Sequence, residues 1–168
     1  LDTLLAEAEA DRPAALLLCG DLTNDGREGE HRELSARLAQ AAAAGVRIFV
    51  TPGNHDLGSE TGPEEFVGYY ADFGYDRALS RDEDSMSYLA EVSDGLWVLS
   101  LDCNIYGDKT SETAATISDA TLAWVEDCLA RAAGAGAMVV PFSHHNLLPH
   151  TLDGTVRNYN NDQAARLG

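Results

Sequence analysis

Cysteine is scarce in this sequence, and so are the structures that depend on it. Only three cysteines occur, and no two of them have the CxxC spacing of a zinc knuckle. Their odd number also argues against a framework of disulfide bonds. We therefore expect all three to pack in the core as small apolar side chains: Cys19, Cys103 and Cys128.

Basic side chains are also scarce, because 11 lysines and arginines stand against 28 acidic residues, for a net charge of −17. A field of this sign repels nucleic acid and anionic membranes, so no nucleic-acid partner is expected. It attracts cations, but over most of the surface we expect it only to keep the protein in solution.

Long apolar runs are missing as well. None approaches the roughly 20 residues that cross a bilayer, so no transmembrane segment is predicted. No signal peptide is recognisable. Because the chain opens with Leu1 rather than Met, a leader or a longer N-terminal piece could have been removed. The compartment, cytoplasmic or extracytoplasmic, therefore stays open, as does the oligomeric state.

The residues that are present predict one α/β domain over residues 1–168, because 45% of them are apolar and no repeat or long linker divides them. Residues 14–19 and 46–50 have the pattern of buried strands. Residues 28–44 form an amphipathic helix pattern that ends at Gly45. Strand, helix and strand in this order predict parallel strands with a right-handed crossover.

Further elements fit the same class. Strands over 85–92 and 96–102 flank an Asp94-Gly95 turn and predict an antiparallel hairpin. Ser118 or Asp119 caps a helix over 118–133, and a strand over 137–142 follows. Shorter helices are predicted over 2–10, over 63–72 and from about Asn161. We expect four aromatic side chains to pack beneath the loop after Asp56 rather than line a substrate cleft: Phe66, Tyr69, Tyr70 and Phe73.

Polar side chains follow three of the apolar strands directly. Asp21 follows the first strand, Asn54 and His55 follow the second, and His144 and His145 follow the last. In an open parallel sheet, ligands bind where strands deliver their carboxyl ends. Each signal alone is weak, because a Gly-Asp turn is common and a loop histidine can be satisfied locally. Three neighbouring strands would nevertheless bring a carboxylate, an amide and imidazoles to one sheet edge.

These groups suit a divalent metal ion. Asp21 offers an anionic oxygen that can bridge two ions, Asn54 a neutral carbonyl oxygen, and His144 a neutral nitrogen. Mixed oxygen and nitrogen ligands favour Mn²⁺, Fe or Zn²⁺ over Ca²⁺, and the lack of cysteine argues against a thiolate site. A metal ion also removes the penalty of burying an isolated carboxylate.

The stretches GDLTNDG and GNHD, about 30 residues apart, with HHNLLPH late in the chain, resemble the calcineurin-like metallophosphoesterases. The similarity is to the bacterial branch of cyclic-nucleotide phosphodiesterase-like phosphohydrolases. It implies a sandwich of two sheets flanked by helices. It also implies hydrolysis of a small phosphoester, a diester or a monoester, by a hydroxide that two divalent metal ions (Mn, Fe or Zn) activate.

The resemblance also implies a role for each motif residue. Asp21 would bridge both metals, while Asn54 and His144 would bind the second one. His55 would protonate the leaving group or steady the transition state. Four further residues would face substrate or support the ligands: Asn24, Asp56, His145 and His150.

Two motifs of that family are missing from the sequence. No Asp-x-His precedes Asp21, and no Gly-His-x-His occurs before Gly168. His31 lies in a charged helix and is expected to be solvated rather than a substitute ligand. We therefore expect a fragment of a longer enzyme, with at most a partial metal site, whose strand over 14–19 exposes an apolar edge. The alternatives are a degenerate member that binds without catalysis, and another α/β hydrolase whose strand ends mimic the motifs.

Overall fold

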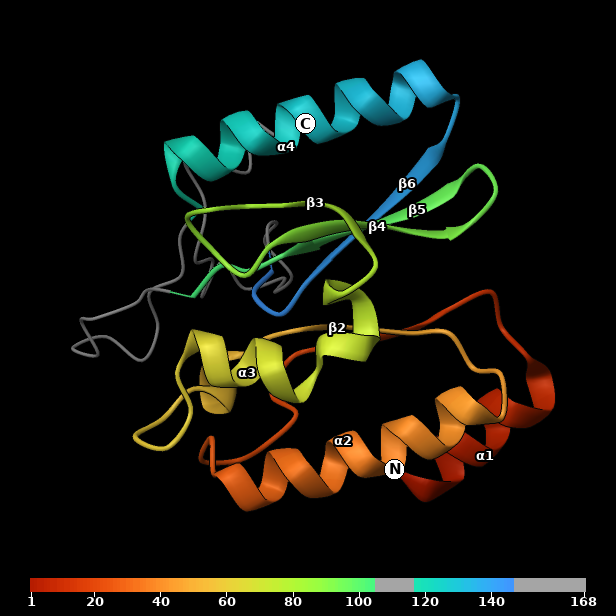
Figure 1. Cartoon of the computed structure of the whole chain (residues 1–168), viewed down its shortest axis with the longest axis vertical. Coiled ribbons are helices and arrows are strands. Elements are labelled where there is room, and N and C mark those ends of the chain that lie inside the picture. Colours follow the sequence, from red (N-terminus) through yellow and green to blue (C-terminus); the bar gives the residue numbers. More distant parts are fainter. Residues whose placement is uncertain (105–116, 147–168) are drawn as a thin grey trace, which may run out of the picture.

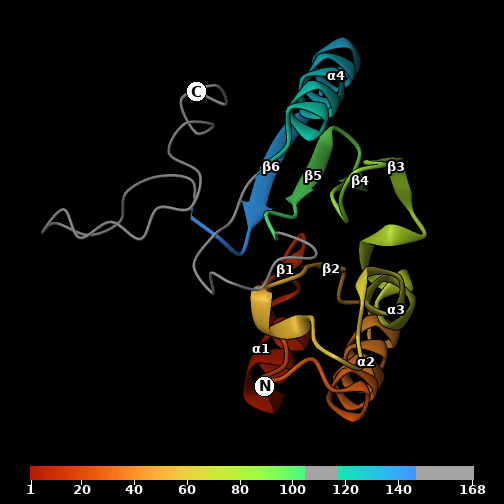
Figure 2. The same ribbon diagram turned by 90° about the vertical axis from the view of Figure 1, so that its left-hand side faces the viewer.

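The computed structural model describes residues 1–104 and 117–146. Within these residues two β-sheets lie between helices, as Figure 1 and Figure 2 show from two directions. The predicted class, an α/β fold with two sheets flanked by helices, is confirmed. The helix expected near Asn161 and the candidate residue His150 lie outside the described residues.

The smaller sheet holds β1 (Leu16–Cys19) and β2 (Ile48–Thr51), which run parallel with Leu16 opposite Ile48. The helix α2 (Glu28–Ala43) connects them, so the predicted strand–helix–strand unit is confirmed. A second helix, α1 (Asp2–Asp11), contacts α2, and both lie at the lower end of Figure 1.

The larger sheet has the strand order β3-β4-β5-β6. Its strands β4 (Tyr88–Ser93) and β5 (Leu96–Leu101) form the predicted antiparallel hairpin, and β6 (Met138–Ser143) pairs parallel with β5. The helix α4 (Asp119–Ala135) covers the face of this sheet that points away from β1 and β2 (Figure 1). The sequence did not indicate β3 (Ala78–Arg81), because four residues between charged neighbours resemble a loop.

Local chemistry sets the ends of these helices. Ser118 caps α4, because its hydroxyl accepts a hydrogen bond of 3.0 Å from the Thr121 N–H. The helix α3 (Pro63–Tyr69) is shorter than the predicted span of 63–72. It gives way to a π-helical turn over Ala71–Tyr75, where Gly74 has a φ of 125° that side chains other than glycine rarely adopt.

Aromatic side chains fill the space between the two sheets. Tyr88 of β4 is fully buried, and its hydroxyl donates to the Val50 carbonyl at 2.8 Å and accepts from the Val50 N–H at 3.1 Å. One phenol thus joins β4 to β2. Phe66, Tyr70 and Phe73 are buried in the same cluster, as predicted for packing beneath the loop.

Three sequence-based predictions are wrong. Cys19 is exposed rather than in the core, although Cys103 and Cys128 are buried. Strand β1 is only half-buried, because within the described residues it pairs with β2 alone. His31 is buried with 0% exposure instead of solvated, because it faces α3 rather than the solvent side of α2.

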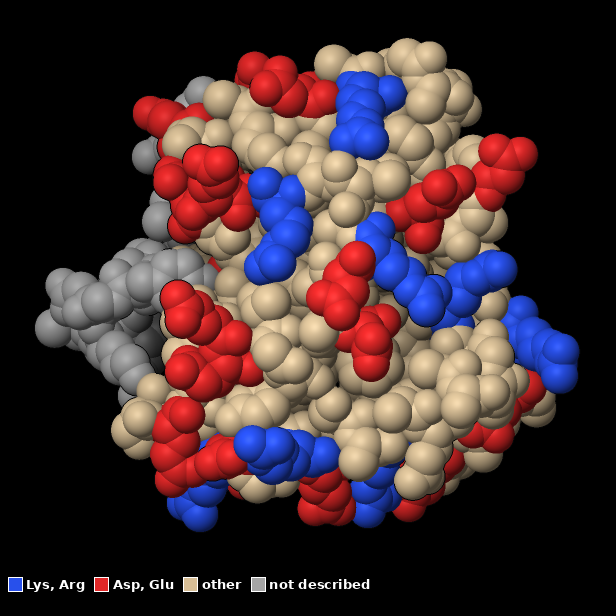
Figure 3. Space-filling view, viewed as in Figure 1, with Lys and Arg blue, Asp and Glu red and all other residues tan. Residues whose placement is uncertain are grey.

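Among the described residues, no helix is both long and apolar enough to span a bilayer. On the face seen in Figure 3, basic side chains stand singly or in small groups among acidic ones.

Candidate functional site

The three predicted metal ligands meet at one point. The His144 Nε2 atom lies 3.3 Å from the Asn54 Oδ1 atom and 3.3 Å from the Asp21 Oδ1 atom. They follow strands β1, β2 and β6. The prediction that these three strands are neighbours in one parallel sheet is wrong, because β6 belongs to the larger sheet. The strand ends converge across the gap between the sheets, where β1 contacts β6.

Two glycines allow this approach. A Cβ atom on Gly20, which has a φ of 79°, would lie 2.6 Å from the Gly53 nitrogen and 2.7 Å from the His144 Cβ. A Cβ atom on Gly53 would collide with the Asp21 nitrogen and Oδ1 atoms. Asp21 itself has a left-handed φ of 51°, a conformation that costs a residue other than glycine about 1 kcal/mol or more and is often kept at functional sites.

The ring of His144 is oriented by the main chain. Its Nδ1 atom lies 2.9 Å from the Cys19 carbonyl oxygen, which can only accept, so Nδ1 carries a proton. In the neutral ring the Nε2 lone pair then faces the oxygens of Asp21 and Asn54. A histidine that donates to a main-chain carbonyl through one ring nitrogen, which leaves the other free to bind a metal, is an arrangement typical of metal ligands.

This donor set fits a divalent cation. A neutral Nε2 atom 3.3 Å from two acceptor oxygens is repelled by them, and a cation bound among the three atoms would remove that repulsion. The set holds one carboxylate, one amide and one imidazole. Within residues 1–104 and 117–146 there is no group of three His, Cys, Asp or Glu side chains that could hold a metal ion, so the ligand set is partial there.

Asp56 ties the turn at the end of β2 to the loop at the end of β1. It is buried, and its carboxylate accepts from the Gly53 N–H and from the Thr23 N–H, each at 2.8 Å. Burial raises the pKa of Asp56, and the hydrogen bonds from Gly53 and Thr23 oppose that shift. Asp56 thus lies in the turn that carries Asn54 and His55, where its carboxylate holds the main chain rather than the three converging donors.

His55 is exposed beside Asp21, and its ring is held in place. Its Nδ1 atom lies 2.9 Å from the Asn24 carbonyl oxygen, so Nδ1 donates, and Nε2 is the nitrogen left to meet a substrate. Its main-chain N–H donates to Asp21 Oδ1 at 3.1 Å. Asn24 therefore supports His55 through its main chain, while its side-chain amide donates to Asp25.

His145, the second histidine of the late motif, has a different environment from His144. His145 is buried beside His144, with ring centroids 4.9 Å apart. Burial, and then the neighbouring His144, lower the pKa of His145 to about 4. The ring is therefore neutral at physiological pH. A buried neutral ring suits support of the site better than contact with substrate.

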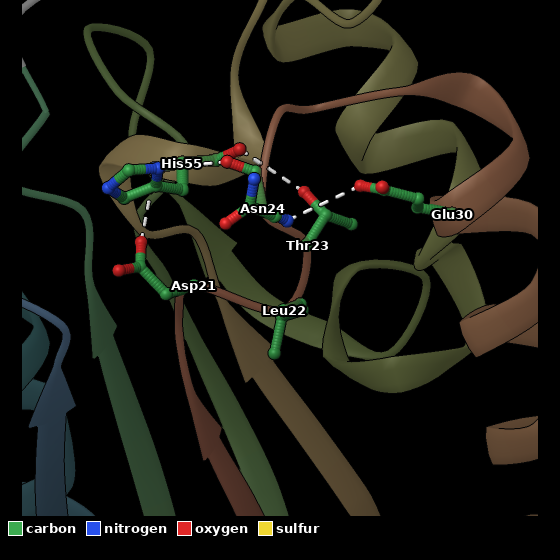
Figure 4. A pocket seen from close by; sticks show the side chains of 6 residues that line it. All are labelled: Asp21, Leu22, Thr23, Asn24, Glu30 and His55. Carbon is green, nitrogen blue, oxygen red and sulfur yellow. Dashed lines mark hydrogen bonds between the residues drawn. The ribbon is translucent and has the colours of Figure 1, made fainter.

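An open hollow of about 510 Å³ adjoins these residues, within the size range of small-molecule sites. Figure 4 shows the side chains that line it, and the Asn24 N–H donating to the Glu30 carboxylate at 3.3 Å. The hollow is lined by Asp21, Leu22, Thr23, Asn24, Glu30 and His55. Thr23 and Glu30 were not predicted from the sequence, although both lie within ten residues of Asp21.

Comparison with known proteins identifies the family. Residues 1–166 match the calcineurin-like phosphoesterases. The chain belongs to this family. It is 30% identical over 158 residues to a cAMP/cGMP dual specificity phosphodiesterase of Mycobacterium tuberculosis. That match covers 92% of this chain but only 43% of the mycobacterial protein, so the chain spans less than half of the relative's length.

A solved structure supports the fold of this phosphoesterase family member. A dimetal phosphatase from Danio rerio superposes with a TM-score of 0.58 at 15% sequence identity. The match covers 86% of this chain and 58% of the other. At this level of identity the likeness concerns the fold alone.

Proposed function

We propose that the protein hydrolyses a small phosphoester in a metal-dependent reaction. The observation that carries this proposal is the meeting of Asp21, Asn54 and His144, with the His144 Nε2 atom 3.3 Å from both the Asn54 Oδ1 and the Asp21 Oδ1 atoms. These three residues would hold the metal. Their oxygen and nitrogen donors favour Mn, Fe or Zn. Such ions, when bound, would neutralise phosphoryl oxygens and lower the pKa of a water molecule.

The charge of the hollow supports a role for a cation. Two carboxylates line it, from Asp21 and Glu30, and no lysine or arginine is among its lining residues. An anionic ester would be repelled from this wall unless positive charge is added. The same wall disfavours a dianionic monoester more than a monoanionic diester. A phosphodiester is therefore the proposed substrate class, in keeping with the name of the mycobacterial relative, a cAMP/cGMP dual specificity phosphodiesterase.

His55 would donate a proton to the leaving group. Its Nδ1–H bond to the Asn24 carbonyl is compatible with both the neutral and the protonated ring, so protonation can change at Nε2 without the ring turning. A proton released from Nε2 would reach the departing oxygen of a bound ester. General acid assistance of this kind contributes about 10²–10⁴-fold in rate.

The test compares Asp21→Asn with the natural full-length protein. Mn²⁺ binding is measured by calorimetry, and hydrolysis with bis-p-nitrophenyl phosphate and p-nitrophenyl phosphate. We expect Asp21→Asn to weaken metal binding by more than the roughly 10–100-fold that follows loss of a supporting residue. The diester should be cleaved faster than the monoester. Asp94→Asn, in the exposed turn between β4 and β5, is the control and should change neither quantity.

The other outcomes have distinct meanings. Metal binding that depends on Asp21 without hydrolysis of either ester would support the alternative of a degenerate, non-catalytic member that binds a ligand. That alternative has one observation in its favour, the partial ligand set among the described residues. Metal content unchanged by Asp21→Asn would contradict both proposals.

A further inference from the structure

A buried hydrogen-bonded chain runs from two helices to the back of the candidate site. His31 of α2 and Tyr70 at the end of α3 are both 0% exposed. The His31 Nδ1 atom lies 2.9 Å from the Tyr70 hydroxyl, and the Nε2 atom lies 2.9 Å from the Asp56 carbonyl oxygen. No part of the proposed chemistry uses His31 or Tyr70.

The direction of each hydrogen bond in this chain follows from its acceptor. The Asp56 carbonyl can only accept, so Nε2 of His31 donates. In the neutral ring Nδ1 then holds the lone pair, and the Tyr70 hydroxyl donates to it. The Asp56 carbonyl therefore selects one tautomer of His31, and the Tyr70 hydroxyl, which can donate or accept, satisfies the remaining ring nitrogen by donating to it.

Aromatic packing holds the ring of His31 in this orientation. The ring stacks on Tyr69 with a centroid distance of 5.2 Å and an interplanar angle of 10°. Phe66 meets the same ring edge-on at 5.8 Å. A ring held between two aromatic neighbours cannot turn its Nε2–H away from Asp56 without repacking the core.

Asp56 is thus held from two sides. Its carboxylate accepts from the main chain of Gly53 and of Thr23, and its carbonyl accepts from His31. The 3₁₀ turn of Asn54–Asp56 contains only three residues, so holding Gly53 and Asp56 restrains the main chain from which the two side chains between them project. Those side chains belong to the candidate ligand Asn54 and the candidate acid His55.

We propose that His31 and Tyr70 are positioning residues, which hold the Asn54–Asp56 turn from behind so that Asn54 and His55 face the site. This inference rests on the proposed function, since it concerns how the proposed ligand and acid are placed. Neither positioning residue touches the hollow or the three converging donors.

The test uses three variants of the full-length protein. His31→Phe keeps an aromatic ring and removes both hydrogen bonds. Tyr70→Phe removes one hydroxyl and leaves the ring packing. His31→Gln keeps an N–H at about the distance of Nε2 and should restore part of what His31→Phe loses. His31→Phe and Tyr70→Phe should each weaken Mn²⁺ binding or lower kcat by roughly 10–100-fold, the range for groups that orient metal ligands.

Hydrogen exchange supplies a readout that needs neither metal nor substrate. In metal-free protein, His31→Phe and Tyr70→Phe should speed amide exchange in residues 53–56 roughly fivefold, the factor expected for loss of about one hydrogen bond. Faster exchange without any Mn²⁺ binding in the natural protein would support the positioning role while contradicting the proposed function. The two proposals can therefore fail separately.

Two controls separate positioning from general stability. Tyr75→Phe makes the same change on a buried tyrosine of the same core, whose hydroxyl has no hydrogen-bond partner among the described residues. Val125→Ala weakens the separate core cluster under α4. If Tyr70→Phe and His31→Phe fold but match these controls in Mn²⁺ affinity, kcat and exchange at 53–56, the positioning role is overturned. Should His31→Phe not fold, Tyr70→Phe alone decides.

Discussion

At the scale of single residues, main-chain carbonyls orient two of the site's imidazoles. The Cys19 carbonyl takes the Nδ1 proton of His144, and the Asn24 carbonyl takes that of His55. Each bond leaves Nε2 facing the site. A carbonyl oxygen has no proton to give, so it selects the tautomer without adding a charge that titrates.

The three thiols should differ in reactivity. Cys19 is exposed at the end of β1, whereas Cys103 and Cys128 are buried. Burial raises the pKa of Cys128 to about 11, so at pH 8 about one in a thousand of these thiols is a thiolate. We expect one thiol per chain to react with a maleimide in native protein and all three in denaturant, with the labelled position found by peptide mass spectrometry.

Raising the pH gives a further check on the thiols. Partial burial raises the pKa of Cys19 as well, so its labelling rate should climb steadily as the pH rises above 8. Rapid labelling of Cys103 or Cys128 in folded protein would contradict the structure.

At the scale of elements, the site depends on how closely the ends of strands approach. The end of β1 and the turn after β2 touch at Gly20 and Gly53, and His144, just after β6, lies against Gly20. The proposed ligands and acid lie just after the strands rather than within them. The strands supply rigid ends from which short turns project these polar groups.

Gly53→Ala should disrupt the site, because the added methyl group would occupy the space of the Asp21 nitrogen and Oδ1 atoms. Backbone has to move, so we expect a loss of about 1–3 kcal/mol in the free energy of unfolding and loss of Mn²⁺ binding. Urea denaturation and calorimetry measure the two effects.

Gly29→Ala is the matched control for that substitution. Gly29 lies in α2, and nothing lies within 4 Å of the position of its added methyl group. Alanine favours a helix over glycine by up to about 1 kcal/mol, so this variant should be more stable and bind metal unchanged. Equal metal binding in Gly53→Ala and Gly29→Ala would show that the close approach at Gly53 is not needed.

At the scale of the whole molecule, an apolar sheet edge is exposed. Strand β6 ends the larger sheet within the described residues, and its Met138 and Val140 are 65% and 38% exposed. Strand β1 ends the smaller sheet and is half-buried. Edge strands with unpaired main-chain groups and apolar side chains favour pairing with another chain.

Met138→Lys should therefore reduce self-association of the 168-residue chain, because a charge on an edge strand opposes pairing with a second copy. The free energy of unfolding should change by no more than about 0.5 kcal/mol, as for other exposed substitutions. Sedimentation velocity and thermal unfolding measure the two. Leu129→Lys, on the exposed side of α4, is the control, because a helix presents no unpaired edge. If Met138→Lys and Leu129→Lys reduce self-association equally, the association comes from exposed apolar surface in general and not from the strand edge.

Much of this protein could be predicted from sequence because the signals are local. The hydrophobic periods predict most helices and strands, and the turn residues predict their ends. The donors Asp21, Asn54 and His144 stand out because each follows an apolar strand. Their chemistry, a carboxylate, an amide and an imidazole, is a property of the residues and does not depend on the fold.

Only the tertiary structure decided how these pieces meet. Cys19 and His144 are 125 positions apart, yet one bond between them orients the ring. The placement of β6 in a second sheet and the burial of His31 depend on which faces pack together. Periodicity records which side of an element is apolar, but the neighbour that covers that side is chosen by the packing of the whole chain.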